Sequence, residues 1–234
     1  MNVDKKSAIK VAIIDNSINP EIYNPIEHWK QHLDAEWDSF RATKNQFPDL
    51  SKDYTHIILT GSEISILERE NWVYEEIELI KQAVNQGLSI LGSCYGHQML
   101  ALALAGPAYV RRCPQPEIGW IAVDIIEKNN ILGNKKRGYS FSIHFDEVMN
   151  LPESFLVLAS SKLCHIQAFQ IRGRHIWGLQ IHPEIDIPSA EKLLRSLINY
   201  DFRGKSLYQR ALNSTPKDTK LIREIVKAFF YDFS

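Results

Sequence analysis

The chain has 234 residues, with 27 basic and 28 acidic side chains and a formal net charge of −1. This balance excludes a bulk electrostatic attraction to nucleic acid or to an anionic membrane surface. The length suffices for one large α/β domain or two small ones. Its apolar stretches all fall short of the roughly 20 residues that a membrane-spanning helix needs, and the N-terminal segment lacks the features of a secretory signal.

The cysteine content indicates a reducing compartment. The chain has three cysteines, Cys94, Cys113 and Cys164, an odd number without close pairing. A small secreted disulfide scaffold would carry paired cysteines at shorter spacing. We therefore expect a cytoplasmic protein in which Cys113 and Cys164 are structural.

The first half of the chain alternates between short apolar runs and segments with helical periodicity. β-Branched runs bounded by polar residues predict buried strands, and apolar residues spaced three and four apart predict amphipathic helices. The predicted strands cover residues 9–14, 54–60 and 88–91, and the predicted helices cover residues 25–40, 72–86 and 96–105. Because strands and helices alternate, we expect a mostly parallel sheet with helices on both faces.

The second half of the chain has a different pattern of apolar residues. Short apolar runs at residues 120–126, 139–143, 155–159, 165–171 and 175–181 are separated by turns, and Arg172-Gly173-Arg174 is typical of a hairpin connection. These runs predict antiparallel strands. Residues 188–200 then have the periodicity of an amphipathic helix, and a helical tail begins at about residue 200. We find no internal repeat or linker and expect residues 1–234 to form a single domain.

A glycine-flanked cysteine is the strongest chemical signal. Gly92-Ser93-Cys94-Tyr95-Gly96 lies between a predicted strand and a predicted helix. In such a strand–turn–helix connection the glycines permit a sharp bend, and the reactive atom stands at the helix N-terminus, where backbone N–H groups favour a thiolate. The alternative is a small buried cysteine in a tight connection, since cysteine is often simply part of the core.

A thiol nucleophile needs a base, and the base needs an orienting group. His182 follows the predicted strand at 175–181, Pro183 ends the strand, and Glu184 stands two residues beyond the histidine. A histidine at the carboxyl edge of a sheet can reach a nucleophile at the end of the neighbouring strand. His28 and His32 are spaced as metal ligands on a helix can be, but no third ligand is identifiable, and we predict no metal site.

Several strings together resemble one family. GSCYGHQ around Cys94, GLQIHPE late in the chain, TGS after the second predicted strand, EIGW and HFDEV are similar to class I, triad-type glutamine amidotransferases, and especially to the glutaminase half of GMP synthetases. The resemblance runs from about residue 9 to residue 196. It implies an α/β, flavodoxin-like central mixed sheet flanked by helices, with an antiparallel extension.

The resemblance also implies a mechanism. Cys94 attacks the γ-carboxamide of glutamine and forms a γ-glutamyl thioester. His182 moves the protons, and Glu184 orients the imidazole. The oxyanion is expected between the backbone N–H groups of Tyr95 and Ser62, the latter in the Gly61-Ser62 loop.

The substrate side of the site is also implied by the resemblance. Gln98 matches a glutamine that contacts the substrate, and the backbone around Ile143, His144 and Phe145 is expected to meet its amino-acid end. Phe145 stands where the family often has glycine. No cofactor is expected.

Three functions remain open. The first is a glutaminase that supplies ammonia to a separate synthetase subunit, because 234 residues leave no room for the ATP-using domain of a GMP synthetase. The second is a stand-alone γ-glutamyl peptide or amide hydrolase or transferase that uses the same thioester. The third is a non-catalytic binding module that keeps the fold.

Overall fold

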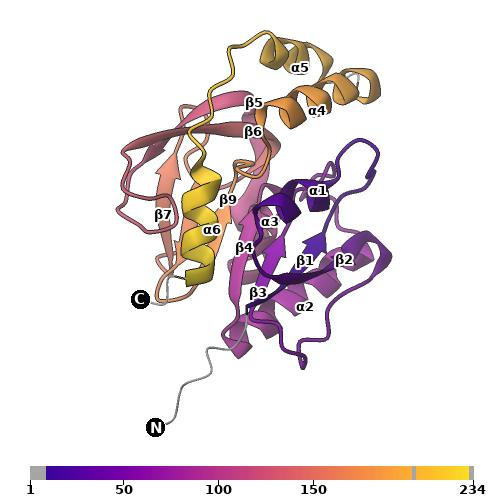
Figure 1. Ribbon diagram of the computed structural model, residues 1–234, viewed down its shortest axis with the longest axis vertical. Helices are drawn as coiled ribbons and strands as arrows, with labels where there is room; N and C mark the ends of the chain where they lie inside the picture. Colours follow the sequence, from indigo (N-terminus) through magenta and orange to yellow (C-terminus); the bar gives the residue numbers. More distant parts are fainter. Residues whose placement is uncertain (1–8, 202–203, 232–234) are drawn as a thin grey trace.

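A nine-stranded mixed β-sheet runs through the molecule in the order β2-β1-β3-β4-β9-β8-β7-β5-β6. The structure, a computed structural model, describes residues 9–201 and 204–231. Residues 1–8, part of the segment considered above for a targeting signal, lie outside the described residues, as do 202–203 and 232–234 of the predicted helical tail. Figure 1 shows helices on both faces of the sheet. The α/β fold class predicted from the sequence is confirmed.

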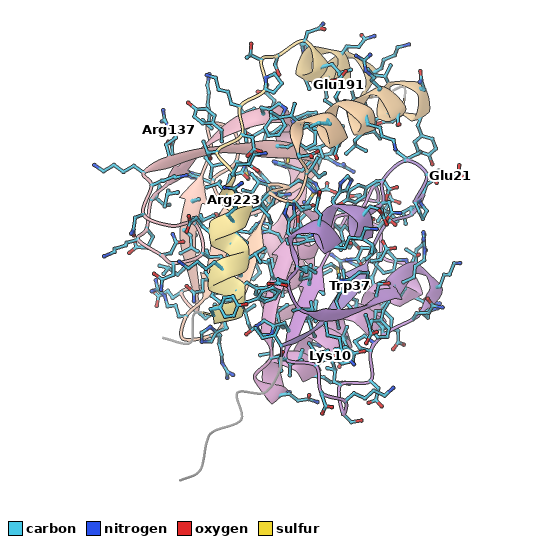
Figure 2. The ribbon with its side chains drawn as sticks, viewed as in Figure 1. Lys10, Glu21, Trp37, Arg137, Glu191 and Arg223 are labelled. Atoms are coloured by element: carbon cyan, nitrogen blue, oxygen red, sulfur yellow. The ribbon has the colours of Figure 1, made fainter. Side chains whose placement is uncertain are left out.

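One half of the sheet is parallel. It contains β1 (Lys10–Asp15), β2 (Glu36–Arg41), β3 (His56–Leu59), β4 (Ser89–Ser93) and β9 (Ile176–Leu179). The four neighbouring pairs in this half are all parallel, so the carboxyl ends of the strands meet at one edge. Figure 2 places Glu21, on the loop after β1, on the same side of the molecule as Glu191, whereas Lys10 lies at the opposite end of β1.

The predicted helix at 25–40 is wrong in its second half. The helix α1 (Pro25–Trp29) is capped by the Asn24 side chain and continues as the 3-10 helix η1 (Lys30–His32). The chain then becomes extended and forms β2, in which Trp37 pairs with Val11 of β1. Pairing with β1 gives one edge of this segment backbone hydrogen bonds, and this long-range pairing overrides the local helical periodicity.

The other predicted elements of the parallel half are confirmed. The helix α2 (Asn71–Gln86) ends at Gly87, whose φ of 77° is the left-handed cap conformation that glycine adopts readily. The helix α3 (Tyr95–Leu104) follows β4 directly. Short 3-10 helices η2 (Ala42–Lys44) and η3 (Pro107–Tyr109) lie at loops. Apolar side chains of α2 and α3 pack on one face of the sheet.

The antiparallel half contains β5 (Val110–Ile125), β6 (Arg137–Val148), β7 (Phe155–Ser160) and β8 (Ala168–Ile171). β5 and β6 form a long hairpin with an irregularity between Arg112 and Glu117, and they extend well beyond the short runs predicted from the sequence. The predicted hairpin at Arg172-Gly173-Arg174 is confirmed, since β8 and β9 pair antiparallel around it.

The C-terminal helices complete two further parts of the core. The helix α4 (Ile187–Tyr200) and the helix α5 (Lys205–Leu212) pack together with Phe141 and Tyr23. The helix α6 (Leu221–Tyr231) lies with α1 on the sheet face opposite α2 and α3, as Figure 1 shows for α6 in front of the sheet. Within the described residues, no helix is both long enough and apolar enough to cross a bilayer.

Candidate active site

Cys94 stands in a strained turn between β4 and α3. Its φ of 50° and ψ of −102° lie outside the regions that residues with a side chain usually adopt. The flanking glycines explain how the turn closes: a Cβ on Gly92 would collide with the backbone of Gly96, and a Cβ on Gly96 would collide with the backbone of Leu59. The Cys94 amide donates to the Leu179 carbonyl at 2.7 Å, which ties the turn to β9. The turn therefore presents the thiol at the N-terminus of α3.

His182 and Glu184 lie at the end of the neighbouring strand. β9 pairs with β4, so the residues after Leu179 reach the same sheet edge as Cys94. His182 Nδ1 donates to Glu184 Oε1 at 2.8 Å, and both side chains are buried. Because Nδ1 is engaged by the carboxylate, Nε2 is the ring nitrogen left for proton transfer. Cys94, His182 and Glu184 thus come together as the sequence predicts, and their catalytic roles are part of the proposal below.

The charges around His182 favour its protonated, imidazolium form. Burial lowers the pKa of His182, but the charges of Cys94 and Glu184 and the hydrogen bonds to both residues outweigh it and raise the pKa to about 10. Burial raises the pKa of Glu184, but the His182 charge and hydrogen bond outweigh it and hold that pKa below its usual value. His182 is therefore positively charged at neutral pH and lies beside the sulfur of Cys94.

Two further contacts hold the thiol. Cys94 Sγ lies 3.5 Å from the carbonyl oxygen of Ile143 on β6, and Gln180 Nε2 donates to Sγ at 3.6 Å. Gln98 Nε2 in turn donates to Gln180 Oε1 at 3.1 Å and to the Asp146 carbonyl at 2.9 Å. Gln98, which is predicted to contact the substrate, holds the Gln180 side chain that contacts the thiol.

The predicted oxyanion site lies between the loop after β3 and the start of α3. Tyr95 is the first residue of α3, so its N–H has no partner within the helix. The loop is tied to α3 because the Gly96 amide donates to the Thr60 carbonyl at 3.0 Å. A Cβ on Gly61 would lie 2.7 Å from His182 Cε1, which requires glycine here. Ser62 follows Gly61 in this loop.

The three predicted substrate residues on β6 differ in their surroundings. Ile143 offers its carbonyl to the thiol, as described above. His144 is buried and its ring Nε2 lies 3.4 Å from Glu117 Oε2, so its side chain belongs to a polar network inside the molecule. The ring of Phe145 contacts Tyr208 of α5 at a centroid distance of 6.5 Å.

His28 and His32, the pair considered above as metal ligands, lie next to Glu184 and Tyr23. His32 Nε2 donates to the Glu184 carbonyl at 3.4 Å, and His28 stacks on Tyr23. Burial lowers the pKa of His28. Both histidines therefore support the wall of the site.

Two residues of the site were missed in the sequence. The Ser93 hydroxyl lies 3.2 and 3.1 Å from the two carboxylate oxygens of Glu184 and donates to that group. Gln180 contacts the thiol. Gln180 lies just beyond the end of β9, two residues before His182, and this position beside the predicted base is the signal that could have found it. Ser93 carries no comparable signal.

Comparison with known protein families identifies the class to which the chain belongs. Residues 11–197 match the glutamine amidotransferase class-I family. This match covers most of the chain, and the protein therefore belongs to the class I glutamine amidotransferases.

Particular relatives fall into two groups. Gamma-glutamyl peptidase 3 of Arabidopsis thaliana is 28% identical over 211 residues, which is 83% of this chain and 82% of that protein. A glutamine-hydrolyzing GMP synthase subunit of Methanocaldococcus jannaschii is 38% identical over 104 residues, which is 44% of this chain and 54% of that protein. A crystal structure of a glutamine amidotransferase from Thermotoga maritima has the same fold, with a TM-score of 0.75, 20% identity, and coverage of 96% of this chain and 99% of that one.

Proposed function

We propose that the protein hydrolyses the γ-amide of glutamine through a thioester on Cys94 and releases ammonia. The Cys94 thiolate attacks the amide carbon, and the oxyanion is held by the N–H groups of Tyr95 and Ser62. Protonated His182 gives its Nε2 proton to the departing nitrogen as the C–N bond breaks. Neutral His182 then takes a proton from water, which attacks the thioester and frees glutamate. Glu184 keeps the imidazole oriented throughout.

One observation carries this proposal: the hydrogen-bonded pair His182–Glu184 stands beside a thiol in a strained turn at a helix N-terminus. A small buried cysteine in a core position needs neither an adjacent imidazole nor a buried carboxylate, and burying these groups is expensive unless they are paired. Membership of an enzyme family argues in the same direction, against a non-catalytic binding module.

The released ammonia needs an acceptor. The relatives named as glutamine-hydrolyzing GMP synthase subunits favour delivery to a separate synthetase chain, and we infer such a partner for this protein. We also place the protein in the cytoplasm, because its cysteines are all free.

A second candidate is hydrolysis of γ-glutamyl peptides. Gamma-glutamyl peptidase 3 aligns along more than four fifths of both chains, whereas the GMP synthase relative matches less than half of this one. The thioester chemistry is the same in both cases, since both substrates present a γ-glutamyl carbonyl. The difference lies in the group that leaves.

The deciding experiment measures glutamate release from glutamine and from γ-glutamyl dipeptides by the purified protein, with ammonia measured in parallel. Cys94→Ala is the control, and we expect it to lose turnover by at least about three orders of magnitude. Turnover confined to glutamine, or stimulated by a cell extract, supports the role of an ammonia supplier.

Faster turnover of dipeptides than of glutamine supports the peptidase instead. Equal rates for the wild-type protein and Cys94→Ala with either substrate would contradict the proposed mechanism. A wild-type protein that releases glutamate from neither substrate, with or without extract, would contradict the proposed function.

A further inference from the structure

Among the described residues the Tyr23 hydroxyl has no hydrogen-bond partner, and the Tyr23 ring lies beside His182. Tyr23 lies on the loop between β1 and α1, at the sheet edge where the strands of the parallel half end. The residue is 4% exposed, and its hydroxyl has no hydrogen-bond partner among the described residues. Figure 2 shows this loop by its neighbour Glu21.

Two contacts locate the hydroxyl. The ring of Tyr23 meets the His182 imidazole edge-on, at a centroid distance of 5.9 Å and an interplanar angle of 83°. A Cβ on Gly61 would lie 2.7 Å from the Tyr23 hydroxyl and 2.7 Å from His182 Cε1. The Tyr23 hydroxyl and His182 Cε1 therefore both lie against the same point of the Gly61-Ser62 loop.

Packing alone does not account for this hydroxyl. Phenylalanine would make the same ring contacts with His182 and His28 without burying an oxygen that lacks a partner, and such an oxygen lowers stability. Burial, followed by the charges of Glu184 and Cys94, raises the pKa of Tyr23 well above its usual value, so the group keeps its proton and stays a donor. A destabilising group next to the reacting atoms is a feature of active sites.

We propose that the Tyr23 hydroxyl hydrogen-bonds the nitrogen that leaves the γ-amide and then the water that replaces it, and so holds each beside His182 Nε2. The inference rests on the proposed function. In the first step the sulfur–carbon bond forms, the C–N bond breaks, and the nitrogen takes its proton from Nε2. In the second step water gives a proton to Nε2, its oxygen bonds to the thioester carbon, and the carbon–sulfur bond breaks, which frees glutamate and the sulfur of Cys94. Tyr23 keeps its own proton in both steps.

The test is Tyr23→Phe in the full chain, which removes only the oxygen. We expect kcat for the better of the two substrates, glutamine or a γ-glutamyl dipeptide, to fall about tenfold, with KM changed less than about twofold. We expect the Tm of this variant to equal or exceed that of the wild-type protein, because the lost hydroxyl had no partner. A residue that only supports the fold would produce the opposite change in Tm.

Tyr54→Phe is the matched control. The Tyr54 hydroxyl donates to Asp38 Oδ2 at 2.6 Å, on the edge strand β2 and outside the site. We expect this variant to lose a few degrees in Tm and to keep the wild-type kcat.

The possible outcomes separate the inference from the proposed function. If the wild-type protein is active and Tyr23→Phe has the same kcat, the inference is wrong and the function stands. A lower Tm for Tyr23→Phe also overturns the inference, whatever the activity. If the wild-type protein turns over neither substrate, the proposed function fails and the leaving-group role fails with it.

Discussion

The turn around Cys94, between β4 and α3, shows how a few residues set the geometry of the site. The φ of 50° at Cys94 costs on the order of 1–3 kcal/mol for a residue with a side chain. Gly92 and Gly96 allow the backbones of β4, α3 and β3 to approach closely enough to hold this conformation. The strain is thus sustained by packing around the turn, and it places the sulfur within reach of Gln180 and Ile143.

Ser93→Ala tests whether the Ser93 hydroxyl stabilises the Glu184 carboxylate. The change removes the hydroxyl that donates to the buried Glu184 carboxylate, so we expect a stability loss of about 1–2 kcal/mol and a several-fold lower kcat from a less well oriented His182. Urea unfolding and steady-state kinetics measure the two effects. Ser142→Ala is the control, because the Ser142 hydroxyl is buried without a partner among the described residues. If both variants behave alike, the Ser93 contact contributes nothing.

A buried histidine, His56, lies where the helix α6 packs on the sheet. His56 of β3 donates from Nε2 to the Phe229 carbonyl at 3.0 Å, and its ring meets the rings of Phe229 and Phe230 edge-on. Thr55 Oγ1 lies 2.7 Å from Nδ1 and donates to it in the neutral ring. Burial lowers the pKa of His56 to about 4, so the imidazole is neutral at physiological pH.

This histidine makes the stability depend on pH. Between its usual pKa of about 6.5 and the folded value of about 4, only the unfolded chain binds the proton, so stability falls as the pH decreases through this window. At pH 5 we expect a loss of roughly 2 kcal/mol relative to pH 7 from His56 alone. Urea unfolding of wild-type protein and His56→Leu at both pH values measures it. The variant lacks this part of the pH dependence, and equal slopes for both proteins would disprove the assignment.

At the scale of the whole molecule, α6 connects the two halves of the sheet. Its apolar side chains pack with Val11 and Ile13 of the parallel half and with Val123 of the antiparallel half. Just before α6, the Thr219 amide donates to the Tyr139 carbonyl on β6, and the Thr219 hydroxyl accepts from the Tyr139 amide. The C-terminal tail therefore covers the sheet.

Removal of the tail tests this connection. α6 contributes six buried apolar side chains, worth on the order of 10 kcal/mol together, which is comparable to the whole stability of a typical domain. We expect a chain ending at Tyr200 to lose cooperative thermal unfolding, as measured by circular dichroism. A chain ending at Ser214, which keeps α5, is the matched control and we expect the same loss. Cooperative unfolding of either chain near the full-length Tm would contradict this role of α6.

The local features of this protein are predictable from its sequence. The glycines around Cys94, the cap at Gly87 and the hairpin at Gly173 were predictable because each conformation depends on residues a few positions apart. The proximity of His182 and Glu184 to Cys94 was predictable because both residues follow a recognisable strand and match a family pattern.

The remaining features depend on tertiary packing. Pairing with β1 makes the second half of the predicted helix at 25–40 the strand β2, and packing brings Gln180 to Cys94, Ser93 to Glu184 and the Tyr23 ring to His182. The physical reason is that these contacts join residues far apart in the chain. They exist because β9 inserts beside β4 and the β1–α1 loop ends at the same sheet edge, and strand order is a property of the packed sheet rather than of any local segment.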